Sequence, residues 1–349
     1  MPGSWLEGSP IMAKAVKKRI TINDIAQMAG TSKTTVSFYL NGKTDRMGED
    51  TQARIRKAIH DTGYEPSPLA RGMNAKKSSL IGVVIGDITN TFANQIVKGI
   101  DSVASTSGYR MLVCSSNFDK QNELAYIDRL LAIGVDGFIV QPTAQFKEIT
   151  KSITDAGKHL VFIDSKLYDF ASNWVKTDNY EASYKAVEAC INKGYKRFLV
   201  VTAAPGLVSS RIERFSGFVD ALEAHELGFT QFILENDQVD TEKLQAFLRA
   251  NIDGETPTLV FAPNCWALSD IYPAMREFYP LMPDRVGLLG FDNPEWVGVA
   301  SPSVSAVQQP AFREGQIAAD ILLDLISEKG EVDPHQVLDC EVNWGATTL

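Results

Sequence analysis

The chain has 349 residues, of which 44% are hydrophobic and 22% charged, a composition typical of folded globular domains. Its formal net charge of −9 is unevenly divided, because residues 1–77 hold 13 Lys and Arg against 7 Asp and Glu, whereas residues 78–349 hold 21 against 36. A basic head on an acidic body concentrates attraction for phosphate at one end. No apolar run is long enough to cross a bilayer and no secretion signal opens the chain, so we exclude a membrane protein and expect a cytoplasmic one.

The basic head begins with a segment, residues 21–41, that predicts two short helices around a tight turn. Thr21 can cap the first helix, with Asp24 three residues later completing a capping box. Gly30 provides the left-handed turn, and Ser32 can cap the second helix. The apolar positions recur at helical spacing: Ile22, Ile25, Ala26, Ala29, Val36 and Leu40.

Two helices joined by three or four residues form a helix-turn-helix, whose second helix can lie in a DNA groove. Short amphipathic helix pairs also occur in proteins that never touch DNA, so this pattern alone leaves both interpretations open. A third, basic helix from Asp50 and a marginally helical segment at 65–74 favour DNA binding, since such a segment can fold when it binds. The expected contacts in the helix pair are Thr21, Ser32, Lys33, Thr34, Thr35, Ser37, Phe38 and Asn41.

The acidic body alternates apolar strand-like runs with amphipathic helical stretches. Continuous apolar strands separated by helices indicate parallel strands that are buried on both faces. The pattern restarts midway, so the sequence predicts an α/β body of two doubly wound parallel sheets in tandem, with a cleft between them. The strand-like runs are 79–86, 110–115, 135–140 and 159–164, and then 197–202, 258–263 and 286–291.

Ligands bind such sheets beyond the carboxyl ends of the strands, so the residues that follow each strand are candidate contacts. These residue types are typical of sugar-binding sites. Carboxylates and amides can bind the hydroxyl groups of a sugar, and the ring of Phe92 or Trp266 can stack on its apolar face. The candidates are Thr91, Phe92, Gln141, Asp164, Lys166, Arg211, Arg214, Asn264, Trp266 and Asp292. Asp292 carries the strongest expectation, although a strand cap or an inter-lobe ion pair would also account for it.

Lys166 and Arg214 suggest an acidic ligand, such as a sugar acid or sugar phosphate, because two cations in a closed cleft would otherwise need partners. Either cation could instead pair with Asp164 or Asp292.

The sequence shows few residue patterns that are typical of catalytic or metal-binding sites. His60, His159, His225 and His335 are scattered, with no nucleophile elbow and no metal-ligand spacing. A glycosidase pair among Asp164, Asp178 and Asp292 is conceivable, but nothing sets their separation. We therefore expect no catalytic residue, no metal and no cofactor. Four distant cysteines, Cys114, Cys190, Cys265 and Cys340, suggest reduced thiols.

Residues 21–74 resemble the LacI/GalR family of bacterial repressors, in DIAQMAGTSKTTVSFYLNG and in a basic helix that ends in GYEPSPLARGM. The resemblance continues through SLIGVVIGDITNTFANQIVKGI, YIDRLLAIGVDGFIV, RFSGF, VGLLGFDN and SVSAVQQP. It implies a hinge helix that enters the minor groove as a dimer and opens a base step with an apolar wedge. Its contacts would be Ser67, Leu69, Ala70, Arg71 and Met73, with Met73 where a leucine is usual.

This chain departs from the family pattern in its second helix, and the resemblance also has implications for the ligand. Phe38 stands where relatives often hold arginine or histidine, so guanine readout is lost there and a thymine methyl becomes a possible contact. Ligand contacts are implied at Phe92, Arg214 and Asp292. The segment GKTDRMGEDT resembles regulators of hexuronate and keto-deoxygluconate breakdown, which favours a keto-deoxy sugar acid as ligand.

The family organisation implies four segments along the chain. The last of them, the body, resembles periplasmic sugar-binding proteins. In such proteins the chain crosses between the two lobes three times, here expected near 164–178, near 292–302 and near the C-terminal segment. We expect a leader at 1–19 with a native start near Met12, a helix-turn-helix domain at 20–66, a hinge helix and linker at 67–79, and a two-lobed effector-binding and dimerisation domain at 80–349. The N-lobe is expected at 80–165 and 304–330, and the C-lobe at 178–292 and 336–349. Dimers would form along the flank of both lobes, including the helix at 95–107.

The sequence thus predicts an effector-responsive transcription regulator, expected to be a repressor, that acts as a homodimer on near-palindromic operator DNA. A tetramer is not expected, since the chain carries no heptad tail. The alternative is a cytosolic sugar-binding or sugar-processing protein whose basic head is incidental. Deleting residues 1–79 would leave the function of such a protein intact.

Overall fold

The computed structural model describes residues 20–40, 42–45, 47–64, 77–168, 170–329 and 333–349. The chain divides into two compact units, residues 1–77 and residues 78–349. The first unit is the head and the second is the body. No helix among the described residues is long and apolar enough to span a membrane.

The head contains the predicted helix pair and the third helix: α1 (Ile22–Met28), α2 (Lys33–Leu40) and α3 (Glu49–Thr62). The capping box at Thr21 and Asp24 is present. Gly30 adopts a φ of 59°, and the Ser32 hydroxyl accepts the Thr35 backbone N–H at 3.1 Å. The three helices share one small core, made of Ile25, Ala26, Ala29, Val36, Ile55 and Ala58.

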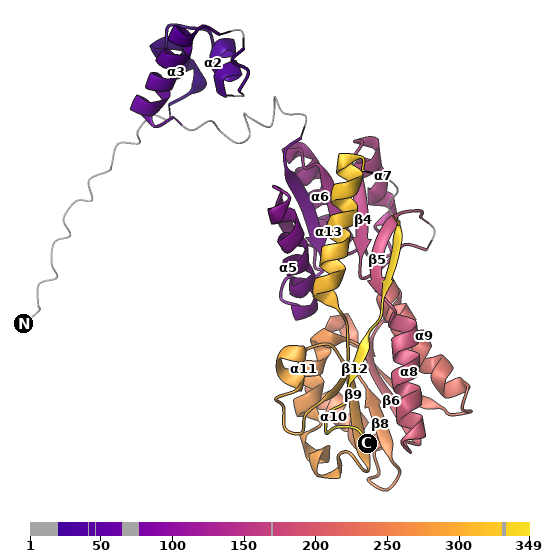
Figure 1. Cartoon of the computed structure of the whole chain (residues 1–349). Helices are drawn as coiled ribbons and strands as arrows, with labels where there is room; N and C mark the ends of the chain where they lie inside the picture. Colours follow the sequence, from indigo (N-terminus) through magenta and orange to yellow (C-terminus); the bar gives the residue numbers. More distant parts are fainter. Residues whose placement is uncertain (1–19, 41, 46, 65–76, 169, 330–332) are drawn as a thin grey trace, which may run out of the picture. The chain divides into compact units, whose positions relative to one another are not determined.

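The body consists of two α/β lobes, each built on a six-stranded sheet (Figure 1). The first sheet has the order β11-β5-β4-β3-β1-β2 and every pairing in it is parallel. Its strands are β1 (Leu80–Ile85), β2 (Arg110–Ser115), β3 (Gly137–Val140), β4 (His159–Ile163), β5 (Asn173–Thr177) and β11 (His335–Leu338). Helices α5 (Thr91–Thr106) and α13 (Ala311–Ser327) cover one face, and α6 (Lys120–Ile133) and α7 (Lys147–Asp155) cover the other.

The second sheet has the order β12-β10-β9-β8-β6-β7, with one antiparallel pairing, between β10 and β12. Its strands are β6 (Arg197–Ala203), β7 (Phe229–Leu234), β8 (Thr258–Phe261), β9 (Val286–Phe291), β10 (Ser305–Gln308) and β12 (Glu341–Asn343). Helices α8 (Asn179–Asn192) and α9 (Ser209–Glu223) pack on one face, and α10 (Thr241–Asn251), α11 (Cys265–Ala274) and α12 (Pro294–Val297) on the other. Short 3-10 turns lie at Pro205–Leu207, Glu235–Asp237 and Arg276–Leu281. The predicted doubly wound sheets are confirmed.

The lobe boundaries differ from those expected at three places. Strand β5 still belongs to the first sheet, so the expected end of the N-lobe segment at 165 is wrong, although the crossing at the end of β5 lies within the expected 164–178. Strand β10 pairs with β9 in the second sheet, so the expected N-lobe start at 304 and the crossing at 292–302 are wrong. Strand β11 pairs with β5, which makes the expected C-lobe start at 336 wrong as well. Short edge strands are assigned by backbone hydrogen bonds to distant partners, and local sequence carries no record of those partners.

Helices α5 and α13 cross in direct backbone contact on one face of the first lobe (Figure 1). A Cβ atom on Gly99 would overlap the carbonyl oxygen of Phe312, and one on Gly315 would overlap that of Ile96. The absence of both side chains allows this approach, and it brings the N-terminal ends of the two helices to the same edge of the lobe.

Candidate functional site

The exposed face of α2 presents the polar and aromatic side chains predicted to meet DNA. Lys33, Thr34 and Phe38 are exposed, and Ser37 is half-buried, whereas Val36 faces the core of the head. Phe38 is 49% exposed, which is unusual for a large ring in a folded domain. Thr21 and Ser32 are exposed and Thr35 is half-buried, as expected of helix ends. Asn41, Ser67, Leu69, Ala70, Arg71 and Met73 lie outside the described residues.

Asp292 is the central carboxylate between the two lobes. It follows strand β9 with a left-handed backbone (φ 54°) and is 4% exposed. Its two carboxylate oxygens accept the backbone N–H of Gln309 at 3.0 Å and the Gln309 side-chain Nε2 at 2.5 Å. Burial raises the pKa of Asp292 to about 6, although Arg214 and Gln309 act in the opposite direction. Both oxygens of Asp292 are therefore hydrogen-bonded to Gln309, the residue at which the chain crosses between the lobes.

Arg214, on α9, is the hydrogen-bonding centre of the buried region around Asp292. Its Nε donates to Asn179 Oδ1 at 2.7 Å, Nη1 to the Pro263 carbonyl at 2.9 Å, and Nη2 to Gln309 Oε1 at 3.0 Å. The guanidinium carbon lies 4.2 Å from the centre of the Phe291 ring. Arg214 thus joins α9 and α8 to the crossing segment.

Asp164 completes the network from the first lobe, where it follows β4 with a φ of 61°. One carboxylate oxygen, Oδ2, accepts Gln141 Nε2 at 2.8 Å and the Ser210 hydroxyl at 3.2 Å. Its backbone N–H donates to Glu314 Oε1 at 2.5 Å. Left-handed backbone at a non-glycine residue costs energy and is concentrated at functional sites, and both Asp164 and Asp292 have it.

Two carboxylate oxygens in this network, Asp164 Oδ1 and Glu314 Oε2, are buried without a hydrogen-bond partner in the described part of the chain. The closest cation to Asp164 Oδ1 is Arg214 Nη2, at 3.9 Å. Burial, followed by the neighbouring Asp164, raises the pKa of Glu314 well above its usual range.

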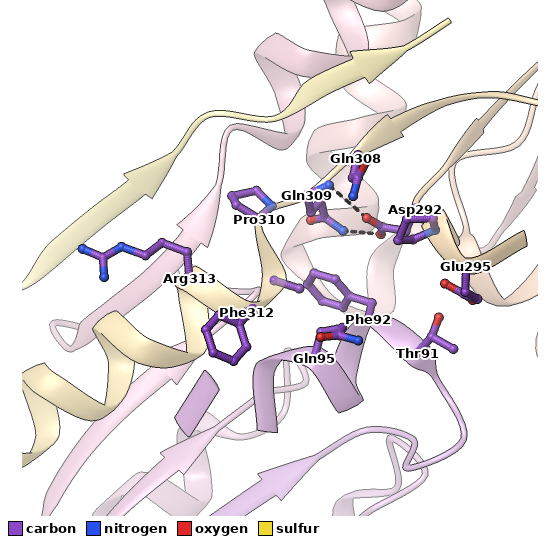
Figure 2. Close-up of a pocket in the computed structure, with 12 residues that line it drawn as sticks. Thr91, Phe92, Gln95, Asp292, Glu295, Gln308, Gln309, Pro310, Phe312 and Arg313 are labelled. Atoms are coloured by element: carbon purple, nitrogen blue, oxygen red, sulfur yellow. Dashed lines mark hydrogen bonds between the residues drawn. The ribbon is translucent and has the colours of Figure 1, made fainter. Parts of the chain in front are cut away.

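A pocket of about 460 Å³ opens beside Asp292, between the N-terminal ends of α5 and α13 and the helix α12 (Figure 2). Figure 2 shows the Phe92 ring beside Gln309 and Asp292, while the guanidinium of Arg313 extends away from them. The lining residues are Thr91, Phe92, Gln95, Asp292, Pro294, Glu295, Gln308, Gln309, Pro310, Ala311, Phe312 and Arg313. The lining combines amides, carboxylates and apolar rings, which suits a small polar ligand with an apolar face.

The predicted site residues are therefore only partly brought together. Thr91, Phe92 and Asp292 line the pocket, and Gln141, Asp164 and Arg214 belong to the network behind it. The remaining four lie elsewhere. Arg211 forms a bidentate ion pair with Asp237, with both N–O distances at 2.9 Å. The side-chain oxygen of Asn264 accepts hydrogen bonds from the Thr202 hydroxyl and the Ala203 backbone N–H. Trp266 packs on the core of the second lobe. Lys166 places its ammonium 5.2 Å from the Tyr168 ring centre and 5.4 Å from that of Trp174.

Sequence reasoning missed Gln309 and Glu314. Gln309 follows strand β10, where the sequence predicted no strand and where residues from 304 onward were expected in the other lobe, so Gln309 was not a residue that follows a predicted strand. Glu314 lies in the first turn of α13, where the helix dipole alone is a sufficient reason for an acidic residue. Its complete burial could not be read from the sequence.

Direct contacts hold the two lobes together around this network. The Lys166 backbone N–H donates to Ser209 Oγ at 2.9 Å, and the Ala144 N–H to the Leu207 carbonyl at 3.0 Å. Lys176 and Glu213 form an ion pair at 2.7 Å. No group of three or more His, Cys, Asp or Glu side chains among the described residues is arranged to hold a metal ion.

A helix-turn-helix head and a two-lobed α/β body with a pocket between the lobes define a ligand-responsive DNA-binding regulator as the class of protein. Residues 21–67 match the model described as "Bacterial regulatory proteins, lacI family", and residues 78–267 match "Periplasmic binding proteins and sugar binding domain of LacI family". Residues 187–348 match a "Periplasmic binding protein-like domain". The chain belongs to the LacI family of bacterial transcriptional regulators, as the sequence predicted.

Three similar proteins illustrate the match. The HTH-type transcriptional regulator KdgR of Bacillus subtilis (strain 168) is 31% identical over 333 residues, covering 95% of this chain and 97% of that protein. The lac repressor dimer bound to operator and the anti-inducer ONPF has a TM-score of 0.78 at 22% identity, covering 95% and 100% of the two chains. A complex of the transcriptional regulator CelR with cellobiose has a TM-score of 0.66 at 20% identity, covering 94% and 100%. At these identities the two solved structures establish the fold alone.

Proposed function

We propose that this transcriptional regulator is a homodimeric repressor whose operator affinity is controlled by a small sugar-like molecule bound between its lobes. One observation carries the proposal: the pocket is lined by Phe92 and Asp292, and its residue Gln309 is also part of the buried network that joins the lobes. A ligand that contacts Asp292 or Gln309 therefore acts on the contacts that set the lobe arrangement.

The control follows from differential binding. A ligand shifts the equilibrium between two lobe arrangements only by the difference in its affinity for them, typically about 1–3 kcal/mol. In the arrangement of this structure, Gln309 donates two hydrogen bonds to Asp292 and accepts one from Arg214. A ligand hydroxyl group that binds Asp292 competes with or adds to these bonds, so occupancy of the pocket changes the relative energy of the arrangements.

The proposed ligand contacts are the pocket residues Thr91, Phe92 and Asp292. Gln141, Asp164 and Arg214 are proposed to couple the pocket to the lobes through the network behind it. Arg211, Asn264, Trp266 and Lys166 have other partners in this arrangement, and we do not retain them as ligand contacts. The cellobiose complex of CelR is consistent with a sugar-type ligand in this fold.

The proposed DNA contacts lie on the exposed face of α2. Lys33 and Thr34 are placed near its N-terminal end, and Phe38 follows one turn later on the same face. An exposed ring at this position fits apolar contact with a thymine methyl group rather than bidentate readout of guanine. The lac repressor dimer on its operator supports a two-fold arrangement of such heads on DNA.

Deletion of residues 1–77 tests whether the head is the DNA-binding part. Ser78 and Ser79 are kept, because their backbone N–H groups donate to Asp136 of the body at 3.0 and 2.8 Å. The full chain is expected to enrich a near-palindromic site from a random DNA pool, and the truncated chain to lose all site selection while keeping ligand binding. A truncated chain that still selects DNA would refute the assignment.

Asp292→Ala tests the pocket. Loss of a charge-assisted hydrogen bond, worth about 1.5–3 kcal/mol, is expected to weaken ligand binding by at least about tenfold. Operator binding without ligand should persist. The control is Asp284→Ala, an exposed carboxylate of the same lobe, which should change neither property. Unchanged ligand affinity in a folded Asp292→Ala protein would place the effector elsewhere.

A further inference from the structure

The body begins at Ser78, and there one carboxylate holds two consecutive backbone N–H groups. The Ser78 N–H donates to Asp136 Oδ1 at 3.0 Å, and the Ser79 N–H donates to Asp136 Oδ2 at 2.8 Å. The Asp136 residue is only 8% exposed. Hydrogen bonds to an ionised carboxylate are stronger than those between neutral groups, and shielding from water strengthens them further. Asp136 therefore fastens the backbone of both serines to the first lobe.

Further hydrogen bonds at the same place fix the direction of the chain. The Ser79 carbonyl accepts the Arg110 N–H at 2.9 Å, and the Ser78 hydroxyl accepts the Leu80 N–H at 3.2 Å. Ser79 has a left-handed backbone, with a φ of 56°. This conformation is unfavourable at a residue other than glycine and persists where the surrounding contacts impose it. The body therefore sets the path of the chain at Ser79 through both its N–H and its carbonyl group.

Asp136 lies directly before β3, and the other end of β3 reaches the network between the lobes. All four residues of β3 are buried, and the strand pairs with β1. After β3, the Gln141 side chain accepts the Gly86 N–H at 2.9 Å and donates to Asp164 Oδ2 at 2.8 Å. Side chains that flank β3 thus hold the backbone before β1 and after it. A movement of the first lobe therefore carries residues 78–79 with it.

We propose that Asp136 is a positioning residue for DNA binding, which fixes the point and the direction at which the chain leaves the body for the head. The inference rests on the proposed function, because it concerns how the two bodies of a dimer place two heads on operator DNA. Without Asp136, residues 78–79 are released, which adds up to about 7 Å to the connection between each body and its head. The backbone of these residues must then lose its freedom when the protein binds the operator.

The spacing of the operator half-sites separates this role from a purely structural one. Two heads held at fixed points select one distance between the two half-sites. A loss of stability lowers the amount of folded protein, and it does so equally for every operator. Longer connections instead weaken the preference for one distance. The ratio of the affinities for different spacings therefore reports positioning, and a change in folding alone leaves it unchanged.

The first experiment measures the affinity of the full chain for operators that differ only in half-site spacing. The reference is the site selected from the random DNA pool, and one or two base pairs are added or removed at its centre. Fluorescence anisotropy at one salt concentration gives each affinity. Asp136→Ala is expected to weaken binding to the reference operator by at least about tenfold, because residues 78–79 are no longer ordered beforehand. Binding to the altered spacings should change by less than about twofold, so the spacing preference falls.

Two further proteins complete the comparison. Asp155→Ala is the matched control, because it removes an exposed carboxylate of the same lobe at the end of α7 and should change neither affinity nor spacing preference. Two glycines inserted between Lys77 and Ser78 lengthen the connection while Asp136 keeps both of its backbone partners. The insertion is expected to reduce the spacing preference as Asp136→Ala does. It also decides the question if the Asp136→Ala protein does not fold.

Amide hydrogen exchange tests the two hydrogen bonds themselves, in the absence of DNA. The Ser78 and Ser79 N–H groups are expected to be protected in the full chain, in the Asp155→Ala protein and in the insertion variant. In a folded Asp136→Ala protein, both groups should exchange at least about tenfold faster. Thermal denaturation of each protein verifies that it is folded.

The outcomes distinguish the inference from the proposed function. Unchanged exchange at Ser78 and Ser79 in a folded Asp136→Ala protein would show that Asp136 does not hold the chain. Faster exchange with an unchanged spacing preference, or an insertion that leaves the preference intact, overturns the positioning role and leaves the operator-binding dimer standing. A full chain that selects no operator overturns the proposed function, and the positioning role with it.

Discussion

At the scale of single residues, the buried carboxyl groups of Asp292 and Glu314 both have pKa values above their ordinary range, and burial is the largest cause for each. Asp292 is stabilised by Gln309 and Arg214, yet burial still raises its pKa from 3.8 to about 6. A carboxyl group whose pKa is raised by folding binds protons more tightly in the folded state.

The stability of the protein is therefore expected to fall as the pH rises from about 4 to above 6, the window between the two pKa values of Asp292. The contribution is fully present below pH 4, is lost as Asp292 ionises, and is on the order of 3 kcal/mol. Glu314 acts in the same direction. Thermal denaturation at pH 5 and pH 7 should show this decrease, and Asp292→Asn should reduce it. An equal decrease in Asp292→Asn and in the exposed control Asp284→Asn would contradict the role of Asp292.

At the scale of secondary-structure elements, the crossing of α5 and α13 positions the pocket. Both helices begin at the pocket, where Asn90 caps α5 by accepting the Phe92 N–H at 3.0 Å and Ala311 opens α13. The close approach depends on Gly99 and Gly315, each facing a backbone carbonyl of the other helix. Backbone atoms in packed helices cannot move aside as the end of a flexible side chain can.

Gly315→Ala is expected to destabilise the protein by about 1–3 kcal/mol, because the added methyl group forces the two helices apart. Ligand affinity should fall with it, as the pocket loses its geometry. Chemical denaturation measures the first effect and calorimetry the second. Gly298→Ala is the matched control, since a Cβ atom there meets nothing within 4 Å and the backbone is right-handed. Equal stability of the two variants would show that the helices are not held by this contact.

At the scale of the whole molecule, charge is divided between the two units. The head, with 13 basic and 7 acidic residues, carries the attraction for DNA, and the acidic body opposes non-specific association. Phosphate contacts release counterions, so affinity for DNA depends steeply on salt, whereas binding of an uncharged ligand does not.

Operator affinity is therefore expected to fall by about three orders of magnitude or more between 50 and 200 mM salt if each dimer makes six or more phosphate contacts. The affinity for an uncharged ligand should change by less than about twofold over the same range. Fluorescence anisotropy and calorimetry on one preparation provide both values. Operator affinity that is insensitive to salt would exclude the basic head as its source, and ligand affinity that falls with salt would indicate a charged effector.

Local features of this protein were determined by the sequence itself. The capping box of Thr21 and Asp24, the turn at Gly30 and the apolar runs that form the central strands all depend on residues within a few positions of one another. The strand-end rule placed Asp292 at the pocket for the same reason, since it needs only the end of one apolar strand.

Only the tertiary structure decided which distant groups meet. Gln309 contacts Asp292 and Arg214 across 17 and 95 positions, and Glu314 contacts Asp164 across 150. The same holds for β10 and β11, whose residues were expected in the wrong lobes, and for Arg211, which pairs with Asp237 instead of facing a ligand. Helical periodicity and capping act between neighbours in the chain, whereas the partner of a buried polar group is chosen by the packing of elements that the local pattern does not encode.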